Sequence, residues 1–356
     1  MEKVNVWRRE LETLAEIAET EPQAAYAAYT KGYKSKFTFF LRTIEDFEEY
    51  LEPIDSVLFD KLTPNLFGGS EPDVPKELLA LNPNDGGIGI ERPGTMANQQ
   101  FKASVLKTKI HVESILDQYT VMREKDIEGN TTKEIEAAYK ASKSQTKKQK
   151  MEKADKKTPE SMKNFVSQAK DKGASSWLNA LPIQEQHLNL NKEQFSDAMR
   201  LRYNIPLSGI PSYCACGNAF NVTHALDCKK GGFVHQRHDN LRDLLTHLLS
   251  KVCKDVEVEP HLLPITTEVM NLRTANTSEE ARLDIKAKGF WQRSQTAFFD
   301  IRVTHVNSSS QRTKPTSAIF RNHEAAKKRE YLQRVLQVEQ GVSTPLVFGN
   351  NGVMGI

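Results

Sequence analysis

The sequence predicts an α+β protein: a helical amino-terminal region, a cysteine–histidine knuckle, and a small mixed sheet flanked by helices in the order αβββαβ. Helical periodicity dominates residues 1–120, four possible metal ligands lie within 214–228, and short apolar strands alternate with helices after residue 233. We therefore expect four segments: a helical region at 1–120, a lysine-rich linker or helix at 121–174, a knuckle region at 175–232, and a sheet domain at 233–356.

Composition is that of a soluble globular protein, because 38% of the 356 residues are hydrophobic and 27% are charged. The formal net charge is only +3, so nucleic-acid binding would depend on local basic patches. Four cysteines in a chain of this length do not form a disulfide framework. No apolar run approaches a membrane span, and the start Met1-Glu2-Lys3 begins no signal peptide. We expect an intracellular protein, nuclear or cytoplasmic, without a membrane partner.

The first segment has the spacing of packed helices. Trp7, Leu11, Leu14 and Ala18 recur at steps of three or four and give residues 2–20 one apolar face. This periodicity predicts a helical core and nothing more specific.

The second segment changes character, because lysines crowd a stretch with almost no large apolar residues: Lys143, Lys147, Lys148, Lys150, Lys153, Lys156 and Lys157. Such a run is most often a solvated helix or a disordered linker, and we interpret it as a domain boundary. The alternative is an unspecific electrostatic grip on phosphates, since no aromatic residues are interleaved for base stacking.

The third segment holds the cluster C-x-C-x7-H-x3-C, formed by Cys214, Cys216, His224 and Cys228. Thiolates and imidazole are the ligands that zinc prefers, and four of them close a structural tetrahedral site. The first pair is shorter than the usual C-x-x-C, so His235 or His238 could replace one ligand. The alternative is three buried or free thiols that merely lie close in sequence. We predict a structural zinc knuckle.

The fourth segment alternates helices and strands. We expect a mixed sheet with helices at its flanks from the following elements: a helix at 237–252, strands at 256–258, 282–286 and 297–304, a helix at 321–338, and a strand at 346–348.

Two carboxylates fall on neighbouring predicted strands. In ARLDI, Asp284 faces away from its apolar neighbours, and in FFDIRV, Asp300 and Arg302 share the face opposite the core. Residues 288–295 could close a hairpin and bring the two aspartates together. Their repulsion would be relieved by a divalent ion, which would also activate water for attack on a phosphate. The alternative is a solvent-facing hairpin with an Asp–Arg surface pair.

Other side chains could complete such a Mg²⁺ site. Glu259, at the end of the first strand, could add a third ligand, and Arg302, or Lys327 or Lys328 from the following helix, could stabilise developing phosphorane charge. His238 and Arg242 lie one helical turn apart and could contact phosphate, although a capped amphipathic helix explains them as well.

These motifs resemble the carboxy-terminal part of reverse-transcriptase polyproteins from non-LTR retrotransposons that carry a restriction-like endonuclease. The resemblance begins near Pro206 and rests on CACGNAFNVTHALDC, RHDNLRD, RLD at 282–284, DIR at 300–302 and KKREY at 327–331. Upstream, EIAETEPQAAY, FFLRTI and NDGGIGI resemble the region after the polymerase palm.

The resemblance implies an enzyme fragment that nicks target DNA to prime reverse transcription, with DNA and element RNA as partners. Asp284 and Asp300 would hold Mg²⁺, Lys328 or Arg302 would assist, and the zinc knuckle would position DNA. No Y-x-D-D motif occurs, so the chain is not a working polymerase.

Two further departures concern the nuclease motifs: Leu283 replaces a proline, and Arg302 replaces a lysine and cannot act as a base. The alternatives are a catalytically inactive nucleic-acid-binding remnant and a zinc-stabilised protein-interaction module.

Overall fold

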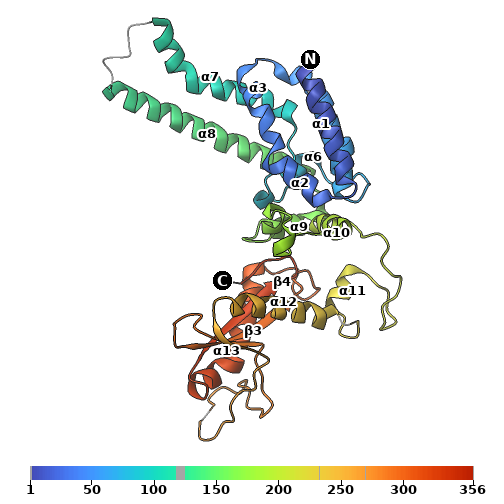
Figure 1. Cartoon of the computed structure of the whole chain (residues 1–356), viewed down its shortest axis with the longest axis vertical. Coiled ribbons are helices and arrows are strands. Elements are labelled where there is room, and N and C mark those ends of the chain that lie inside the picture. Colours follow the sequence, from blue (N-terminus) through green and yellow to red (C-terminus); the bar gives the residue numbers. More distant parts are fainter. Residues whose placement is uncertain (1, 118–124, 232, 269, 356) are drawn as a thin grey trace. The chain divides into compact units, whose positions relative to one another are not determined.

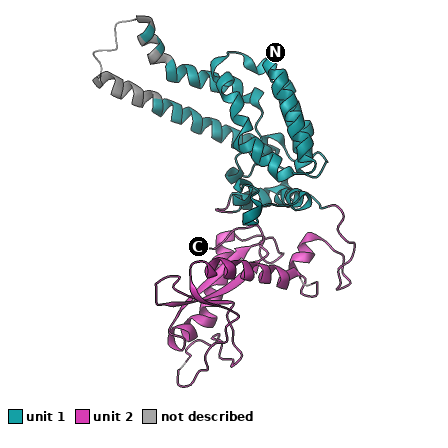
Figure 2. Ribbon diagram, viewed as in Figure 1, with its two compact units in different colours: residues 1–170, 174–207 teal, residues 171–173, 208–356 magenta. Residues whose placement is uncertain are grey.

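The computed structural model describes residues 2–117, 125–231, 233–268 and 270–355. The chain divides into two compact units (Figure 2). Unit 1 comprises residues 1–170 and 174–207, and unit 2 comprises residues 171–173 and 208–356. The predicted limits at 120 and 174 thus do not coincide with the division between the units, which falls near residue 207.

Unit 1 is helical (Figure 1). Its α-helices are α1 (Glu2–Ala18), α2 (Pro22–Lys31), α3 (Thr38–Thr43), α4 (Glu52–Ser56), α5 (Thr63–Leu66), α6 (Lys76–Leu79), α7 (Pro93–Asp117), α8 (Lys125–Lys157), α9 (Glu160–Ala169) and α10 (Lys192–Arg202). Within the described part of the chain, no helix is long and apolar enough to cross a membrane.

The apolar face predicted for α1 anchors the core of unit 1. Trp7, Leu11 and Ala18 are buried, while Leu14 is half-buried at the edge of the same face. The Trp7 ring meets Phe37 and Phe40 edge-on, with centroids 5.2 and 4.9 Å apart. Edge-to-face pairs of this kind stabilise a core beyond the area that they bury.

The lysine-rich segment is helical and belongs to unit 1. Three of its lysines form ion pairs with the segment 77–91: Lys147 with Asp85 at 2.8 Å, Lys150 with Glu91 at 3.4 Å, and Lys157 with Glu77. Lys148, Lys153 and Lys156 are exposed, but Glu152 and Asp155 lie among them and are exposed too. Several lysines in the described part of α8 are therefore paired with carboxylates, and others lie beside exposed acidic residues. This favours the interpretation as a solvated helix over that of a phosphate-binding segment.

Unit 2 is a mixed α+β unit, and its elements follow the order αβββαβ that the sequence predicts after residue 233. They are α11 (Val222–Asp227), α12 (Phe233–Ser250), β1 (Lys254–Val258), β2 (Ile285–Lys288), β3 (Thr296–Thr304), α13 (Thr316–Gln337) and β4 (Val342–Gly349). The two long helices begin earlier than predicted, and the last strand is longer.

The four strands form one sheet in the order β1-β2-β3-β4. β1 pairs with β2 and β2 with β3 in antiparallel fashion, whereas β3 and β4 are parallel because α13 connects them. On one face, Phe299 and Ile301 pack against Leu249 of α12. On the other, Phe298 packs against Tyr331 and Val335 of α13. Strand β3 is therefore covered on both faces.

This double coverage changes the expected environment of the acidic face. The predicted alternation is present, because Phe299 and Ile301 face one side. The opposite side is not solvent, however: α13 covers it, and Asp300 is only 5% exposed. Arg302, two residues further along, is exposed.

A buried arginine fixes the long loop between β1 and β2. The guanidinium of Arg334, which is 1% exposed, donates to the carbonyl oxygens of Asn276 at 3.1 Å, Ser278 at 2.7 Å and Leu263 at 2.9 Å. This loop leads to Asp284 and β2. Arg334 therefore fixes the position of the segment that precedes Asp284.

Replacing Arg334 by leucine should destabilise unit 2 by at least about 2 kcal/mol, because it leaves carbonyl acceptors without donors. Urea unfolding of the two variants R334L and R329L measures this. Arg329 is exposed on the same helix, and its substitution should change the free energy of unfolding little. Equal losses in both variants would contradict the role given to Arg334.

Candidate functional site

The four predicted metal ligands converge in unit 2. The sulfurs of Cys214 and Cys228 are 3.7 Å apart, and the Cys216 sulfur lies 3.2 Å from Nε2 of His224. All four ligand atoms lie within 4.8 Å of one another. A tetrahedral zinc ion with Zn–S bonds of about 2.3 Å places two sulfurs about 3.8 Å apart, so the ligand set fits the ion. Within the described ranges, no other group of three or more such residues converges in this way.

The short C-x-C spacing works because the chain turns tightly there. The Gly217 amide donates to the Cys214 carbonyl at 2.8 Å, and Gly217 has a φ of +86°, which favours glycine. Helix α11 then presents the second pair: the Asn221 side chain caps it by accepting from the His224 amide at 2.8 Å. Because His224 supplies the fourth ligand atom, neither alternative histidine is needed.

The cluster also has the chemistry of a thiolate site. A backbone amide at Asn218 is the largest influence that lowers the pKa of Cys216, which is about 6, and the neighbouring thiols and His224 act in the same direction. A thiolate is the form that binds metal. The cluster can therefore hold a metal ion such as zinc, and its four ligands leave no open position for catalysis.

The metal cluster is joined to the sheet. Asp227, one residue before Cys228, lies 3.1 Å from Nδ1 of His305, which is buried just after β3. Arg237 of α12 donates to the Leu226 carbonyl at 3.3 Å. These contacts fix α11 on α12 and on the end of β3, and the sequence reasoning did not anticipate them.

The two predicted carboxylates lie beside each other in the chain's hairpin, but only Asp300 is on a strand: β2 spans Ile285–Lys288 and not the predicted 282–286, so Asp284 lies just before it. Residues 289–295 close the expected hairpin, and Ile285 of β2 pairs with Phe299 of β3. Asp284 immediately precedes Ile285: its amide donates to the Phe299 carbonyl, and its Oδ2 accepts from the Ile301 amide. Asp284 therefore bonds to the backbone on both sides of Asp300.

Each carboxylate has its own cation. Nε2 of His238, on α12, lies 3.4 Å from Oδ1 of Asp284, and Nζ of Lys327, on α13, lies 2.9 Å from Oδ1 of Asp300. The repulsion that suggested a shared divalent ion is thus offset in this structure by two side chains. The lysine beside Asp300 is Lys327 rather than Lys328, because a helix turns by about 100° per residue and Lys328 points to solvent.

One carboxylate oxygen of Asp300 is left without a partner. Burial raises its pKa to about 6, against the effect of Lys327, and the charge of Asp284 raises it further. Its Oδ2 atom is buried and has no hydrogen-bond partner. Such an orphaned acceptor in a buried carboxylate is rare and calls for an explanation. A bound cation would satisfy it.

Glu259 is not part of a preformed three-carboxylate cluster among the described residues. It pairs with Arg242 and lies 4.0 Å from Arg282, although its amide donates to the Asp284 carbonyl at 2.9 Å. Its side chain is 47% exposed.

The predicted phosphate contacts on α12 are engaged by acids. His238 pairs with Asp284, and Arg242 pairs with Asp239, Asp243 and Glu259. Both side chains serve to organise the carboxylates in this structure. Phosphate contact by either would require those pairs to open.

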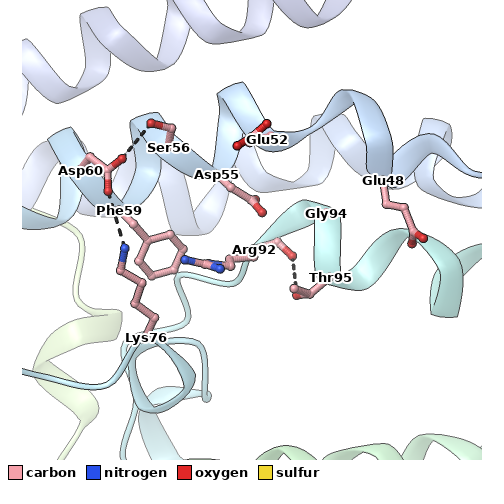
Figure 3. A pocket seen from close by; sticks show the side chains of 10 residues that line it. All are labelled: Glu48, Glu52, Asp55, Ser56, Phe59, Asp60, Lys76, Arg92, Gly94 and Thr95. Atoms are coloured by element: carbon pink, nitrogen blue, oxygen red, sulfur yellow. Dashed lines mark hydrogen bonds and ion pairs between the residues drawn. The ribbon is translucent and has the colours of Figure 1, made fainter.

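Unit 1 contains a separate cleft of about 520 Å³, lined by Glu48 and by residues of α4, the helical segment 57–62, α6 and the start of α7 (Figure 3). Burial raises the pKa of Asp55 to about 6, although the Gly94 amide opposes this. Lys76 pairs with Asp60 at 3.6 Å, and the Arg92 guanidinium lies 5.1 Å from the centre of the Phe59 ring. Four acidic and only two basic side chains line this cleft, which does not suit a phosphate, so we place the functional site in unit 2.

Comparisons with known proteins provide no further guide to the site. Neither a protein-family model nor a curated protein matches the chain.

Purified protein should contain about one equivalent of zinc, because the four ligands complete one tetrahedral site. Cys216→Ser and His224→Gln should each lose most of the metal, as measured by inductively coupled plasma mass spectrometry. Cys253→Ser is the matched control, since Cys253 lies outside the cluster. Zinc retained in the first two variants would contradict the assigned ligands.

The pairing of His238 with Asp284 should make the stability of unit 2 depend on pH. The hydrogen bond with Asp284 raises the pKa of His238 to about 9, against burial, from about 6.5 in an unfolded chain. Because the folded pKa is the higher one, this stabilisation is complete below about pH 6.5 and is lost as the pH rises through about 9.

Urea unfolding at a series of pH values, without magnesium, tests this. His238→Gln should flatten the decline between those two values, whereas His235→Gln should leave it unchanged, since His235 is exposed. An identical decline in both variants would show that another group is responsible.

Proposed function

We propose that unit 2 is a magnesium-dependent DNA endonuclease of the restriction-like type, and that the chain is a fragment of a retroelement protein that nicks target DNA to prime reverse transcription. One observation carries the proposal. Asp284, just before β2, bonds to the backbone on both sides of Asp300 of β3, and Asp300 has a buried, unpartnered oxygen in addition to the one that pairs with Lys327.

The topology supports this proposal. A four-stranded mixed sheet in the order αβββαβ is what the family resemblance implies. The RLD motif immediately precedes β2, and the DIR motif lies on the adjoining strand β3, which supports a shared site for the two carboxylates. The departure at Arg302 is offset by Lys327, which brings a primary amine to Asp300 from α13.

The roles of the residues follow from their contacts. Asp284 and Asp300 would hold Mg²⁺. Glu259, which follows β1 and donates its amide to the Asp284 carbonyl, could add a third carboxylate. When bound, Mg²⁺ polarises a phosphate oxygen and lowers the pKa of a coordinated water. Lys327 stabilises negative charge near Asp300, and His238 orients Asp284 through its Nε2 contact.

The zinc cluster has a positioning role in this proposal. Its link to His305 attaches the knuckle to the end of β3, the strand that carries Asp300. A rigid attachment of this kind would hold a DNA or element RNA segment in a fixed relation to the carboxylates.

A catalytically inactive nucleic-acid-binding remnant is the second candidate. It is favoured by the closed pairing of both aspartates with His238 and Lys327, and by the arginine at position 302.

The full chain should nick supercoiled plasmid in the presence of Mg²⁺. Asp284→Asn and Asp300→Asn should each lower the rate at least about 100-fold, because each removes a charged ligand of the metal. Glu257→Gln is the matched control: Glu257 is an exposed carboxylate on β1 that pairs with Lys286.

A second matched pair tests the lysine. Lys327→Ala should lower nicking more than Lys328→Ala, although the two residues adjoin and carry the same charge. Nicking that survives in the Asp284→Asn/Asp300→Asn double variant would overturn the endonuclease assignment. Salt-sensitive DNA binding without nicking by the wild type would support the inactive remnant, and no DNA binding would favour a protein-interaction module.

A further inference from the structure

Helix α13 and strand β3 meet through a ladder of matched side chains. Along α13, the positions at steps of four that face β3 are His323, Lys327, Tyr331 and Val335. At one end of the ladder the contacts are apolar, since Phe298 packs against Tyr331 and Val335. At the other end they are polar.

The polar end begins at Asp300 and continues beyond it. Nζ of Lys327 binds Asp300, and Nε2 of His323 lies 3.3 Å from Oγ1 of Thr304. Arg302 lies between Asp300 and Thr304 on the same face of β3, because side chains alternate along a strand. Unlike Asp300, it is exposed.

Arg302 belongs to a cationic cluster without carboxylates. Nε2 of His323 contacts Thr304, two residues from Arg302 on the same face of β3, and the charges of Arg302 and Lys314 add to burial in lowering the pKa of His323. Lys314 is exposed on the loop before α13. Among the described residues, no carboxylate forms an ion pair with Arg302 or Lys314, whereas Arg242, Arg282 and Lys327 all have one.

The surrounding segment is strongly basic. Residues 311–334 hold seven lysines and arginines against two glutamates, a net charge of +5, while the whole chain carries only +3. Within unit 2, α13 and the loop before it therefore form a basic segment beside Asp300. A local patch of this kind attracts a polyanion even when the protein as a whole is nearly neutral.

We propose that Arg302, Lys314 and His323 form a subsite for a backbone phosphate of a nucleic-acid strand, next to the phosphate that Asp284 and Asp300 address. This inference rests on the proposed function. Two residues along a strand span about 7 Å, which corresponds to about two nucleotides at an axial rise of about 3.4 Å per nucleotide. The subsite would therefore hold the strand one or two nucleotides from the reacting phosphate.

The chemistry of the three side chains matches this assignment. A guanidinium binds phosphate through two parallel hydrogen bonds, and a lysine adds a point charge. Burial and the two neighbouring cations lower the pKa of His323, which favours the imidazole as a hydrogen-bonding group over a charged one. In this proposal Arg302 binds a phosphate, and it does not take the role of a base.

The test is DNA binding by the full chain in buffer without added magnesium, followed by fluorescence anisotropy with a short labelled duplex at several salt concentrations. Arg302→Gln and Lys314→Gln should each weaken binding about fivefold and reduce the slope of log K against log salt by about 0.9. His323→Gln should weaken binding without changing that slope. Arg302→Lys should keep the slope and lose part of the affinity.

Arg329→Gln is the matched control, because Arg329 makes the same charge change from the opposite, exposed face of α13. Equal effects of Arg302→Gln and Arg329→Gln would overturn the subsite in favour of diffuse electrostatics. Binding of inorganic phosphate by a wild type that does not bind the duplex would overturn it as well. Thermal melting of each variant verifies that the fold is intact.

The outcomes also separate this inference from the endonuclease assignment. Nicking that depends on Asp284 and Asp300 but not on Arg302 would remove the subsite and leave the enzyme. DNA binding that depends on Arg302, together with nicking that does not depend on either aspartate, would support the phosphate subsite and contradict the endonuclease assignment.

Discussion

The architecture of unit 2 depends on a carboxylate that is buried between a strand and a helix. Asp300 lies on β3, which is covered by α12 on one face and by α13 on the other, and only 5% of the residue is exposed. A buried carboxylate is unfavourable unless a cation or hydrogen bonds compensate it. Lys327 supplies one cation, but one oxygen stays without a partner. That imbalance is a cost to folding which a functional ligand would explain.

Other features of unit 2 serve to hold this carboxylate opposite Asp284. On α13, Lys327 forms an ion pair with Asp300 of β3. Two turns further along the same helix, Arg334 donates hydrogen bonds to the loop that leads into β2. Asp284 is then fixed by bonds to the backbone on both sides of Asp300. At the far end of β3, the His305–Asp227 contact attaches the metal cluster. One strand thus links the carboxylates and the cluster.

The sequence was informative where the signal is local. The αβββαβ order follows from periodicity, the β2–β3 hairpin from the short segment 288–295 between the two strands, and the cluster of four possible metal ligands from their spacing. Tertiary relations were not predictable in this way. Whether Lys327 or Lys328 meets Asp300 depends on the rotation of α13 about its axis, and the burial of Asp300 depends on that helix covering the face that alternation alone leaves open. The lysine-rich segment was ambiguous because its acidic partners lie in the distant segment 77–91.

The most direct measurement of the central claim is the anomalous scattering of crystals soaked in Mn²⁺, which replaces Mg²⁺ at oxygen sites. If Asp284 and Asp300 form one metal site, a single strong peak should lie about 2.2 Å from an oxygen of each carboxylate, with Lys327 displaced from Oδ1 of Asp300. A map without manganese at these carboxylates, in which Lys327 still binds Asp300 and His238 still binds Asp284, would contradict it.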